Sequence, residues 1–192
     1  MTTTALVMKV GGSLAASPLL QGWLDASATA AGRVVLVPGG GPFADTVRAT
    51  QRALGFDDPT AHAMALLAMA QYGLFLASRV AALVPAETPQ DIADALRAQR
   101  IPVWLPPRTL GPSDGVAASW DVTSDSLALW LAARIGAPAL LLVKSRSDGG
   151  DLLDPAFGGM RPGYGGRVYL AGPEHLPRHG IDPLHPPGVV LP

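Results

Sequence analysis

The residues best suited to chemistry in this sequence are glycines and a lysine that follow short apolar runs. Lys9 precedes Gly11, Gly12 and Ser13, and a second apolar run leads into Gly39-Gly40-Gly41. Glycine has no side chain, so its backbone N–H groups can surround phosphate oxygens closely. A helix that begins after such a loop adds the partial positive charge of its N-terminus. One glycine pair alone is more often a tight turn, but two loops of this kind predict a phosphate site.

Lysine is scarce in the chain. Of 14 Lys and Arg residues only two are lysines, Lys9 and Lys144, and each stands at the end of an apolar run. Lysine carries a compact point charge on a flexible stem, whereas arginine offers a rigid planar fork. We therefore expect both lysines to contact phosphate. The sequence contains neither a Walker loop nor a Rossmann glycine fingerprint, so a nucleotide site here belongs to another class.

Two acids, Asp121 and Asp125, lie around the predicted start of a helix. Thr123 or Ser124 is expected to cap this helix, and Asp125 falls in its first turn, where the helix dipole favours a carboxylate. One interpretation is an ordinary capping acid. The other is that one acid orients the lysines or contacts magnesium.

The elements that must position these residues follow from the apolar pattern. Continuous apolar runs without alternation are typical of parallel strands covered on both faces. Alternation of such strands with helices predicts an α/β fold, a three-layer αβα sandwich with a mostly parallel open sheet. Ligands of open sheets bind outside the carboxyl ends of the strands, where the glycines and Lys144 are expected. We predict strands at 5–10, 34–37, 101–105 and 139–143, a short extended segment at 120–122, and helices from Ser17-Pro18 and at 43–54, 58–83, 89–99 and 124–135.

Composition predicts one soluble domain over residues 1–192. The chain is 48% hydrophobic and 15% charged, which is typical of a globular protein with a sizeable core. Residues 145–192 are rich in glycine and proline and are predicted to be a loop-rich tail, packed on the domain or mobile. The apolar stretch 61–83 is interrupted by polar residues, so no membrane span is expected.

Charge and residue usage exclude several function classes. The net charge of −1 without a basic stripe gives no support for nucleic acid binding. The absence of cysteine excludes disulfides and zinc–thiolate sites. No acidic cluster accompanies His175, His179 and His185, and Pro177 argues against a regular helical His175–His179 face, so no metal site is predicted there. The N-terminus shows no signal-peptide pattern, and a cytoplasmic location is the default expectation.

Several segments resemble the amino acid kinase superfamily. These are Lys9-Val10-Gly11-Gly12-Ser13, residues 38–45, and the helix at Asp125 with the strand that follows it. Within this superfamily, three stretches resemble the furan-phosphate kinases of methanofuran and methylofuran biosynthesis, which leads to a one-carbon carrier cofactor. They are residues 37–45, Ala61-His62 with 68–73, and residues 119–126. The resemblance covers roughly residues 5–144. It implies an amino acid kinase-like fold with a shortened C-terminal part, ATP and Mg²⁺ as cofactors, a small phosphorylated substrate such as an aminomethyl-furanmethyl phosphate, and a homo-oligomer.

The resemblance also implies roles for single residues. Lys9 would contact the transferred phosphoryl group, and Asp125 would orient the lysine. Asp45 would pair with an aminomethyl cation, although a solvated first-turn acid explains it equally well. His62 faces the same choice between a ligand contact and a helix-start residue. The predicted substrate and phosphate site contains Gly11, Gly12, Ser13, Gly39, Gly40, Gly41, Asp45 and His62.

The predicted nucleotide half departs from the family pattern. It comprises Lys144, Ser145, Asp148 and Gly149, with Ser145 where an acid is expected. No lysine follows Lys144, although many members carry a second catalytic lysine further along the chain. Two explanations stay open. Lys144 replaces that lysine as a catalytic residue, or the chain has lost catalysis and serves as a ligand-binding or assembly subunit.

Overall fold

The computed structural model describes residues 6–107, 110–148 and 152–192. A seven-stranded sheet in the order β3-β4-β2-β1-β5-β6-β7 forms its centre, with β7 antiparallel to β6 and the other neighbours parallel. The strands are β1 (Leu6–Val10), β2 (Val34–Pro38), β3 (Leu83–Ala86), β4 (Ile101–Trp104), β5 (Ala139–Val143), β6 (Arg167–Ala171) and β7 (Val189–Leu191).

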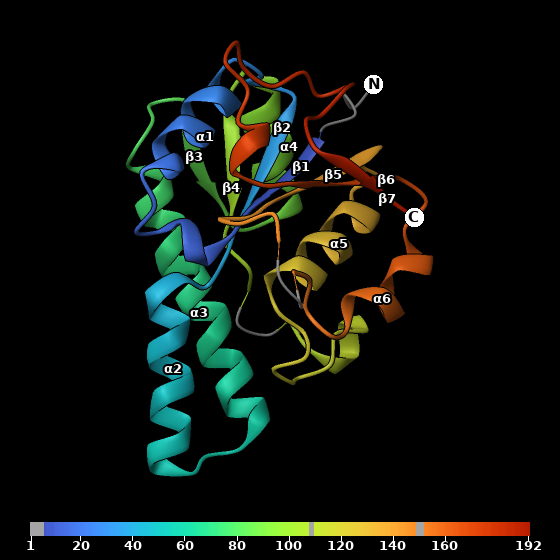
Figure 1. The fold of residues 1–192 in the computed structure, drawn as a ribbon. Coiled ribbons are helices and arrows are strands. Elements are labelled where there is room, and N and C mark those ends of the chain that lie inside the picture. Colours follow the sequence, from blue (N-terminus) through green and yellow to red (C-terminus); the bar gives the residue numbers. More distant parts are fainter. Residues whose placement is uncertain (1–5, 108–109, 149–151) are drawn as a thin grey trace.

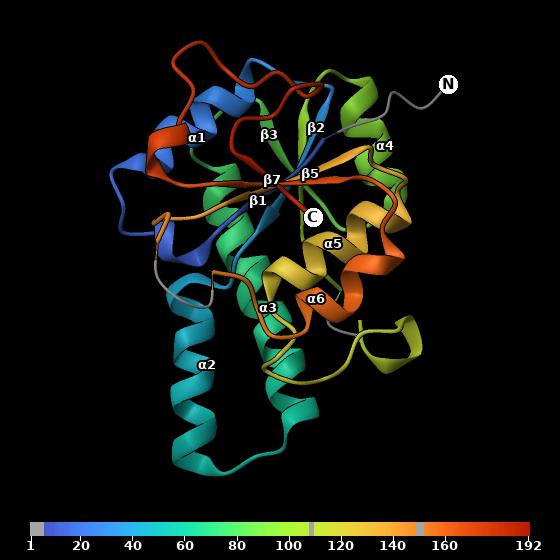
Figure 2. The ribbon, with the colours of Figure 1, turned by 45° about the vertical axis from the view of Figure 1, so that its right-hand side comes forward.

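Helices cover both faces of this sheet (Figures 1 and 2). Helices α1 and α3 pack on one face through Trp23 and Tyr72, and α4 and α5 pack on the other through Ile92 and Leu127. The three-layer α/β prediction is confirmed. The helices are α1 (Leu19–Ala28), α2 (Gly41–Leu54), α3 (Asp58–Ala77), α4 (Pro89–Arg97), α5 (Ser124–Arg134) and α6 (Phe157–Met160), with 3-10 turns at Gly12–Leu14, Pro112–Asp114, Arg161–Gly163 and Pro173–His175.

The alternation of side chains along β1 and β5 decides where the two lysines point. Val7 and Leu142 belong to the apolar cluster on the α5 face. Because side chains two residues apart share a face of a strand, Lys9 and Lys144 follow them onto that same face. The Lys144 N–H donates to the Ala171 carbonyl at 2.8 Å, which continues the sheet pairing by one residue beyond β5.

Two predicted elements are wrong. The helix expected at 58–83 ends at Ala77, and Leu83–Ala86 is the edge strand β3 instead. Proline in a helix interior removes a hydrogen bond, whereas an edge strand tolerates it, and Pro85 stands in this segment. The extended segment expected at 120–122 is a turn, since the Val122 N–H donates to the Ser119 carbonyl at 3.2 Å.

The described part of the tail packs on the domain. It supplies β6, which pairs with β5 along its full length, and β7 at the sheet edge. The Ile181 N–H donates to the Ala26 carbonyl at 3.1 Å and ties the tail to α1.

Helices α2 and α3 form an antiparallel pair that extends beyond the sheet (Figure 1). The outer side of α3 leaves Leu67, Leu74 and Phe75 exposed. Among the described residues, α3 is the one helix whose length and composition would suffice to cross a membrane, a test that core helices of soluble proteins also pass. Homo-oligomer formation stays a prediction.

The two glycine loops meet because β1 and β2 pair in register, with Val10 opposite Pro38. A Cβ atom on Gly12 would clash with the backbone of Gly41, and one on Gly39 would clash with the backbone of Gly12. Gly41 also has φ +54°, a left-handed conformation that favours glycine. The close approach of the loops therefore depends on glycine.

We predict that Gly12→Ala lowers the free energy of unfolding by about 1–3 kcal/mol, because the loops must separate to admit the methyl group. Urea unfolding measures the change. Gly159→Ala is the matched control, since its Cβ would meet no atom within 4 Å. Equal stability of the two variants would show that the loops separate without cost.

Candidate active site

Three charged side chains converge beside the glycine loops. The Lys9 Nζ lies 2.8 Å from Asp125 Oδ1 in an ionic contact, and the Lys144 Nζ donates a hydrogen bond to Asp125 Oδ2 at 2.6 Å. The side chains of Lys9, Asp125 and Lys144 are only 6%, 5% and 12% exposed. One carboxylate therefore holds two ammonium groups from neighbouring strands in a nearly dry setting.

Electrostatics leave this cluster with an excess of positive charge. Burial raises the pKa of Asp125, but the charges of Lys9 and Lys144 outweigh it and bring the pKa below its ordinary value. Burial, followed by the repulsion of Lys9, lowers the pKa of Lys144 to about 8, against the opposing attraction of Asp125. Two ammonium groups facing one carboxylate suit a phosphate group.

Asp154, which sequence reasoning did not single out, holds the start of α5. Thr123 is the N-cap residue of α5, one of the two residues expected there, but its side chain makes no capping hydrogen bond. Instead, Asp154 Oδ2 accepts from the N–H groups of Thr123 and Ser126 at 2.9 and 3.0 Å and from Thr123 Oγ1 at 2.9 Å, and Asp154 also accepts from Ser126 Oγ. The Asp154-Pro155 dipeptide in an otherwise loop-rich stretch was the only available signal.

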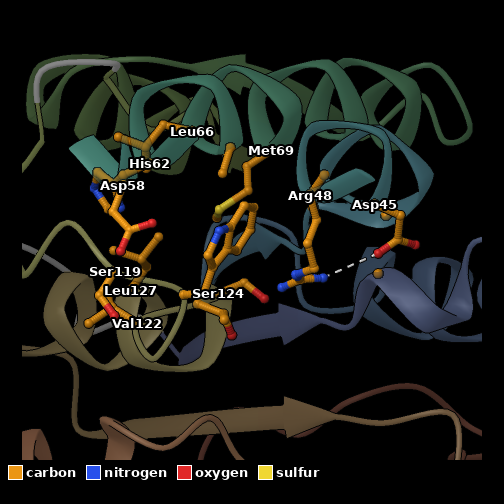
Figure 3. A pocket seen from close by; sticks show the side chains of 17 residues that line it. Asp45, Arg48, Asp58, His62, Leu66, Met69, Ser119, Val122, Ser124 and Leu127 are labelled. Atoms are coloured by element: carbon orange, nitrogen blue, oxygen red, sulfur yellow. Dashed lines mark hydrogen bonds and ion pairs between the residues drawn. The ribbon is translucent and has the colours of Figure 1, made fainter. Parts of the chain in front are cut away.

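A cavity of about 190 Å³ lies between the α2–α3 pair and the segment that leads into α5 (Figure 3). The glycine loops form one end through Gly12, Gly40 and Gly41, and α2, α3 and the 119–127 segment form the walls. The N-terminus of the 14-residue α2 lies at the glycine end, which favours an anion there. The shape suits a small molecule that carries a phosphate.

Asp45 and His62 both line this cavity. Asp45 pairs with Arg48 at 3.4 Å, and its side chain is 76% exposed. The His62 Nε2 lies 3.0 Å from the Leu110 carbonyl, which can only accept, so Nε2 carries a proton. In the neutral ring, Nδ1 is therefore left as an acceptor. Figure 3 shows Asp45 beside Arg48, and His62 beside Asp58.

A second cavity, of about 400 Å³, lies beside the charged cluster and is lined by Asp125. Lys144 and Ser145 line it, and Ser145 donates to Ser13 Oγ at 2.8 Å. The Asp148 carbonyl accepts from Arg146 at 3.2 Å. Gly149, also predicted for the nucleotide site, lies outside the described residues. The two cavities adjoin at Thr123, which lines both, and at the neighbouring residues Gly12 and Ser13, of which Gly12 lines the first cavity and Ser13 the second.

No three His, Cys, Asp or Glu side chains in the described ranges come together in a way that would hold a metal ion. Asp125 and Asp154, the acids nearest the second cavity, are both engaged by the contacts given above. These residues do not form a magnesium cage.

The fold and the site define a class of protein. The sheet is open and mostly parallel, and two glycine loops and two lysines lie at its strand ends, where two cavities adjoin. These features define a phosphate-binding α/β protein. Residues 4–148 match the model of the amino acid kinase family, and the chain belongs to that family. The resemblance expected from the sequence is thereby confirmed.

Individual relatives agree with this assignment. The chain is 32% identical over 127 residues to the [5-(aminomethyl)furan-3-yl]methyl phosphate kinase of Methanocaldococcus jannaschii, which covers 65% of this chain and 58% of that protein. Uridylate kinase from Archaeoglobus fulgidus has the same fold, with a TM-score of 0.67 and 15% identity over 97% of this chain and 99% of that one. An isopentenyl phosphate kinase matches with a TM-score of 0.56 and 13% identity, over 97% and 100% of the two chains.

We predict that Asp125→Asn lowers the free energy of unfolding at neutral pH by about 3–5 kcal/mol, because it leaves two buried ammonium groups without their anion. Urea unfolding measures this loss. The double variant Asp125→Asn/Lys144→Met should recover a substantial part of it, since one of the two stranded charges is gone. A single variant within about 0.5 kcal/mol of the wild type would contradict the role of the ion pairs.

Proposed function

We propose that this protein is an ATP-dependent phosphotransferase whose acceptor is itself a phosphate monoester. The supporting observation is the carboxylate of Asp125, which pairs with both Lys9 and Lys144 beside the glycine loops and lines the larger cavity together with Lys144. The larger cavity, with Lys144 and Ser145, would take the nucleotide. The smaller one, with the Gly40 and Gly41 end, would take the acceptor. The transferred group would then pass between them beside both ammonium groups.

The reaction needs little covalent chemistry from the chain. A phosphate monoester is largely dianionic at neutral pH, so its oxygen attacks the γ-phosphorus of ATP without a general base. The bond from the γ-phosphorus to the bridging oxygen breaks, and ADP leaves with that electron pair. Lys9 and Lys144 would neutralise the charge on the transferring oxygens, while Asp125 fixes their positions.

Lys144 would supply the second cation that many family members take from a later segment. It reaches the same carboxylate as Lys9 from the next strand of the sheet. This supports the catalytic explanation over a catalytically impaired subunit. Mg²⁺ would enter bound to the nucleotide phosphates, because it commonly keeps several waters and few protein ligands.

The acceptor we propose is an aminomethyl-furanmethyl phosphate, a precursor of methanofuran-type one-carbon carriers. The name and similarity of the Methanocaldococcus jannaschii relative support this. The glycine end of the cavity would hold the phosphate of the substrate. Asp58 and His62 also line the cavity, and each offers a hydrogen-bond acceptor for an amine. We also propose that the protein is cytoplasmic, where ATP is available.

The direct test is transfer of the γ-phosphoryl group from labelled ATP to [5-(aminomethyl)furan-3-yl]methyl phosphate. We expect Lys9→Met and Lys144→Met each to lower kcat by roughly 100- to 1,000-fold, since each removes a cation that would stabilise the transition state. Arg52→Ala, on the exposed last turn of α2, is the charge-matched control and should leave kcat unchanged. Calorimetry with ATP shows separately whether each variant still binds nucleotide.

If either lysine variant kept the kcat of the wild type, the role assigned to that lysine would be refuted. Nucleotide binding by the wild type without transfer to any phosphate acceptor would instead favour the impaired-subunit alternative.

The pKa of Lys144, about 8, predicts a pH dependence of ATP affinity. Deprotonation removes a positive charge, so affinity should be steady at neutral pH and fall by roughly tenfold as pH rises above about 8. Lys144→Arg keeps its charge and should show a flat profile over the same range. Calorimetric titrations at several pH values measure both curves, and a flat wild-type curve would contradict the prediction.

A further inference from the structure

Trp120 lines the acceptor cavity and contacts α2, which is distant from it in the sequence. Its Nε1 donates to Gln51 Oε1 at 2.6 Å, and the guanidinium of Arg48 lies 4.2 Å from its ring centroid. Gln51 and Arg48 belong to α2, whereas Trp120 belongs to the turn before α5. The indole is half-buried and lines the cavity.

The contacts of Gln51 fix the orientation of this indole. Gln51 Nε2 donates to Asp58 Oδ1 at 2.8 Å and to the Phe56 carbonyl at 3.2 Å. Both partners are acceptors, so the amide nitrogen must face them and Oε1 must face Trp120. Arg48 is itself held by Asp45 at 3.4 Å. The indole is therefore set in place before any acceptor arrives, which reduces the cost of ordering it on binding.

The cavity around Trp120 suits a flat ring. Its other walls include the apolar side chains of Leu66, Met69 and Leu127, and the glycine loops line the same cavity. Aromatic rings stack favourably on an indole, whereas a branched aliphatic chain gains only the general benefit of burial. A phosphate at the glycine end would leave the rest of an acceptor among these side chains.

We propose that Trp120 is a specificity-determining residue of the acceptor site, which selects phosphates that carry a planar ring over aliphatic phosphates. Gln51 and Arg48 are its positioning residues. This inference rests on the proposed function, because it takes the smaller cavity as the acceptor site. It adds a class of acceptor and the side chain that recognises it.

The test is calorimetric binding of two acceptors without nucleotide, [5-(aminomethyl)furan-3-yl]methyl phosphate and isopentenyl phosphate. We expect Trp120→Leu to weaken binding of the ring phosphate by about tenfold or more and to change binding of the aliphatic phosphate by less than about threefold. Trp120→Phe keeps a ring but loses the hydrogen bond to Gln51, so its effect should be intermediate. It also serves as the conservative variant if Trp120→Leu unfolds.

Trp130→Phe is the matched control. Trp130 stacks on Trp104 and donates to the Asp114 carbonyl at 3.0 Å, and it does not line the acceptor cavity. This variant should bind both phosphates as the wild type does.

Each outcome has a distinct meaning. Equal loss of both phosphates in Trp120→Leu, unchanged binding of the ring phosphate, or no binding of it by the wild type would overturn the inference. Selective loss of ring binding in a protein that transfers no phosphoryl group would sustain the role of Trp120 and refute the kinase proposal. If the wild type phosphorylated the ring phosphate and Trp120→Leu bound that phosphate as tightly as the wild type, the kinase proposal would be sustained and the role of Trp120 refuted.

Discussion

One carboxylate shared by two lysines is the constraint on which the site depends. Asp125 has both of its oxygens engaged, one by Lys9 and one by Lys144, at 2.8 and 2.6 Å. Buried charges are tolerated only when they are paired, so none of the three side chains can move without stranding another. The arrangement fixes the ends of β1 and β5 and the start of α5 relative to one another. A ligand meets a charge pattern that is already assembled.

The support for that carboxylate comes from far along the chain. Asp154 lies 28 residues beyond Ser126 and caps α5 in place of a local side chain. It satisfies helix N–H groups that would otherwise be unpaired and adds negative charge near the positive end of the helix dipole. The short C-terminal part thus contributes to the site indirectly, through the helix that carries Asp125.

Charge and shape recognition are assigned to different parts of the molecule. The cationic cluster and the glycine loops lie at the carboxyl ends of the central strands, where strand pairing holds the backbone in place. The walls of the smaller cavity, which we propose as the acceptor site, come from α2, α3 and the turn at Trp120. Such a division lets one sheet serve many acceptors within a family, because the walls can change while the phosphate-handling groups stay in place. The low identity to uridylate kinase alongside a shared fold fits this view.

The sequence by itself determined the central strands of the sheet and the strand ends that carry the chemically active residues. Continuous apolar runs predicted the strands at 34–37 and 139–143, and the glycines and lysines marked the ends where ligands bind. The edge strand at Leu83 was missed because a short apolar run cannot be assigned to a helix or a strand by periodicity alone.

Only the tertiary structure decided which groups meet. Nothing local links Lys144 to Asp125, Asp154 to the start of α5, or Trp120 to Gln51, because each contact joins residues that are 19 to 69 positions apart. Thr123 takes the N-cap position that local propensity favours, yet the distant carboxylate of Asp154 accepts the hydrogen bonds at the start of the helix. Strand order and helix placement create these meetings, and both arise from burying the whole apolar surface at once rather than from any single segment.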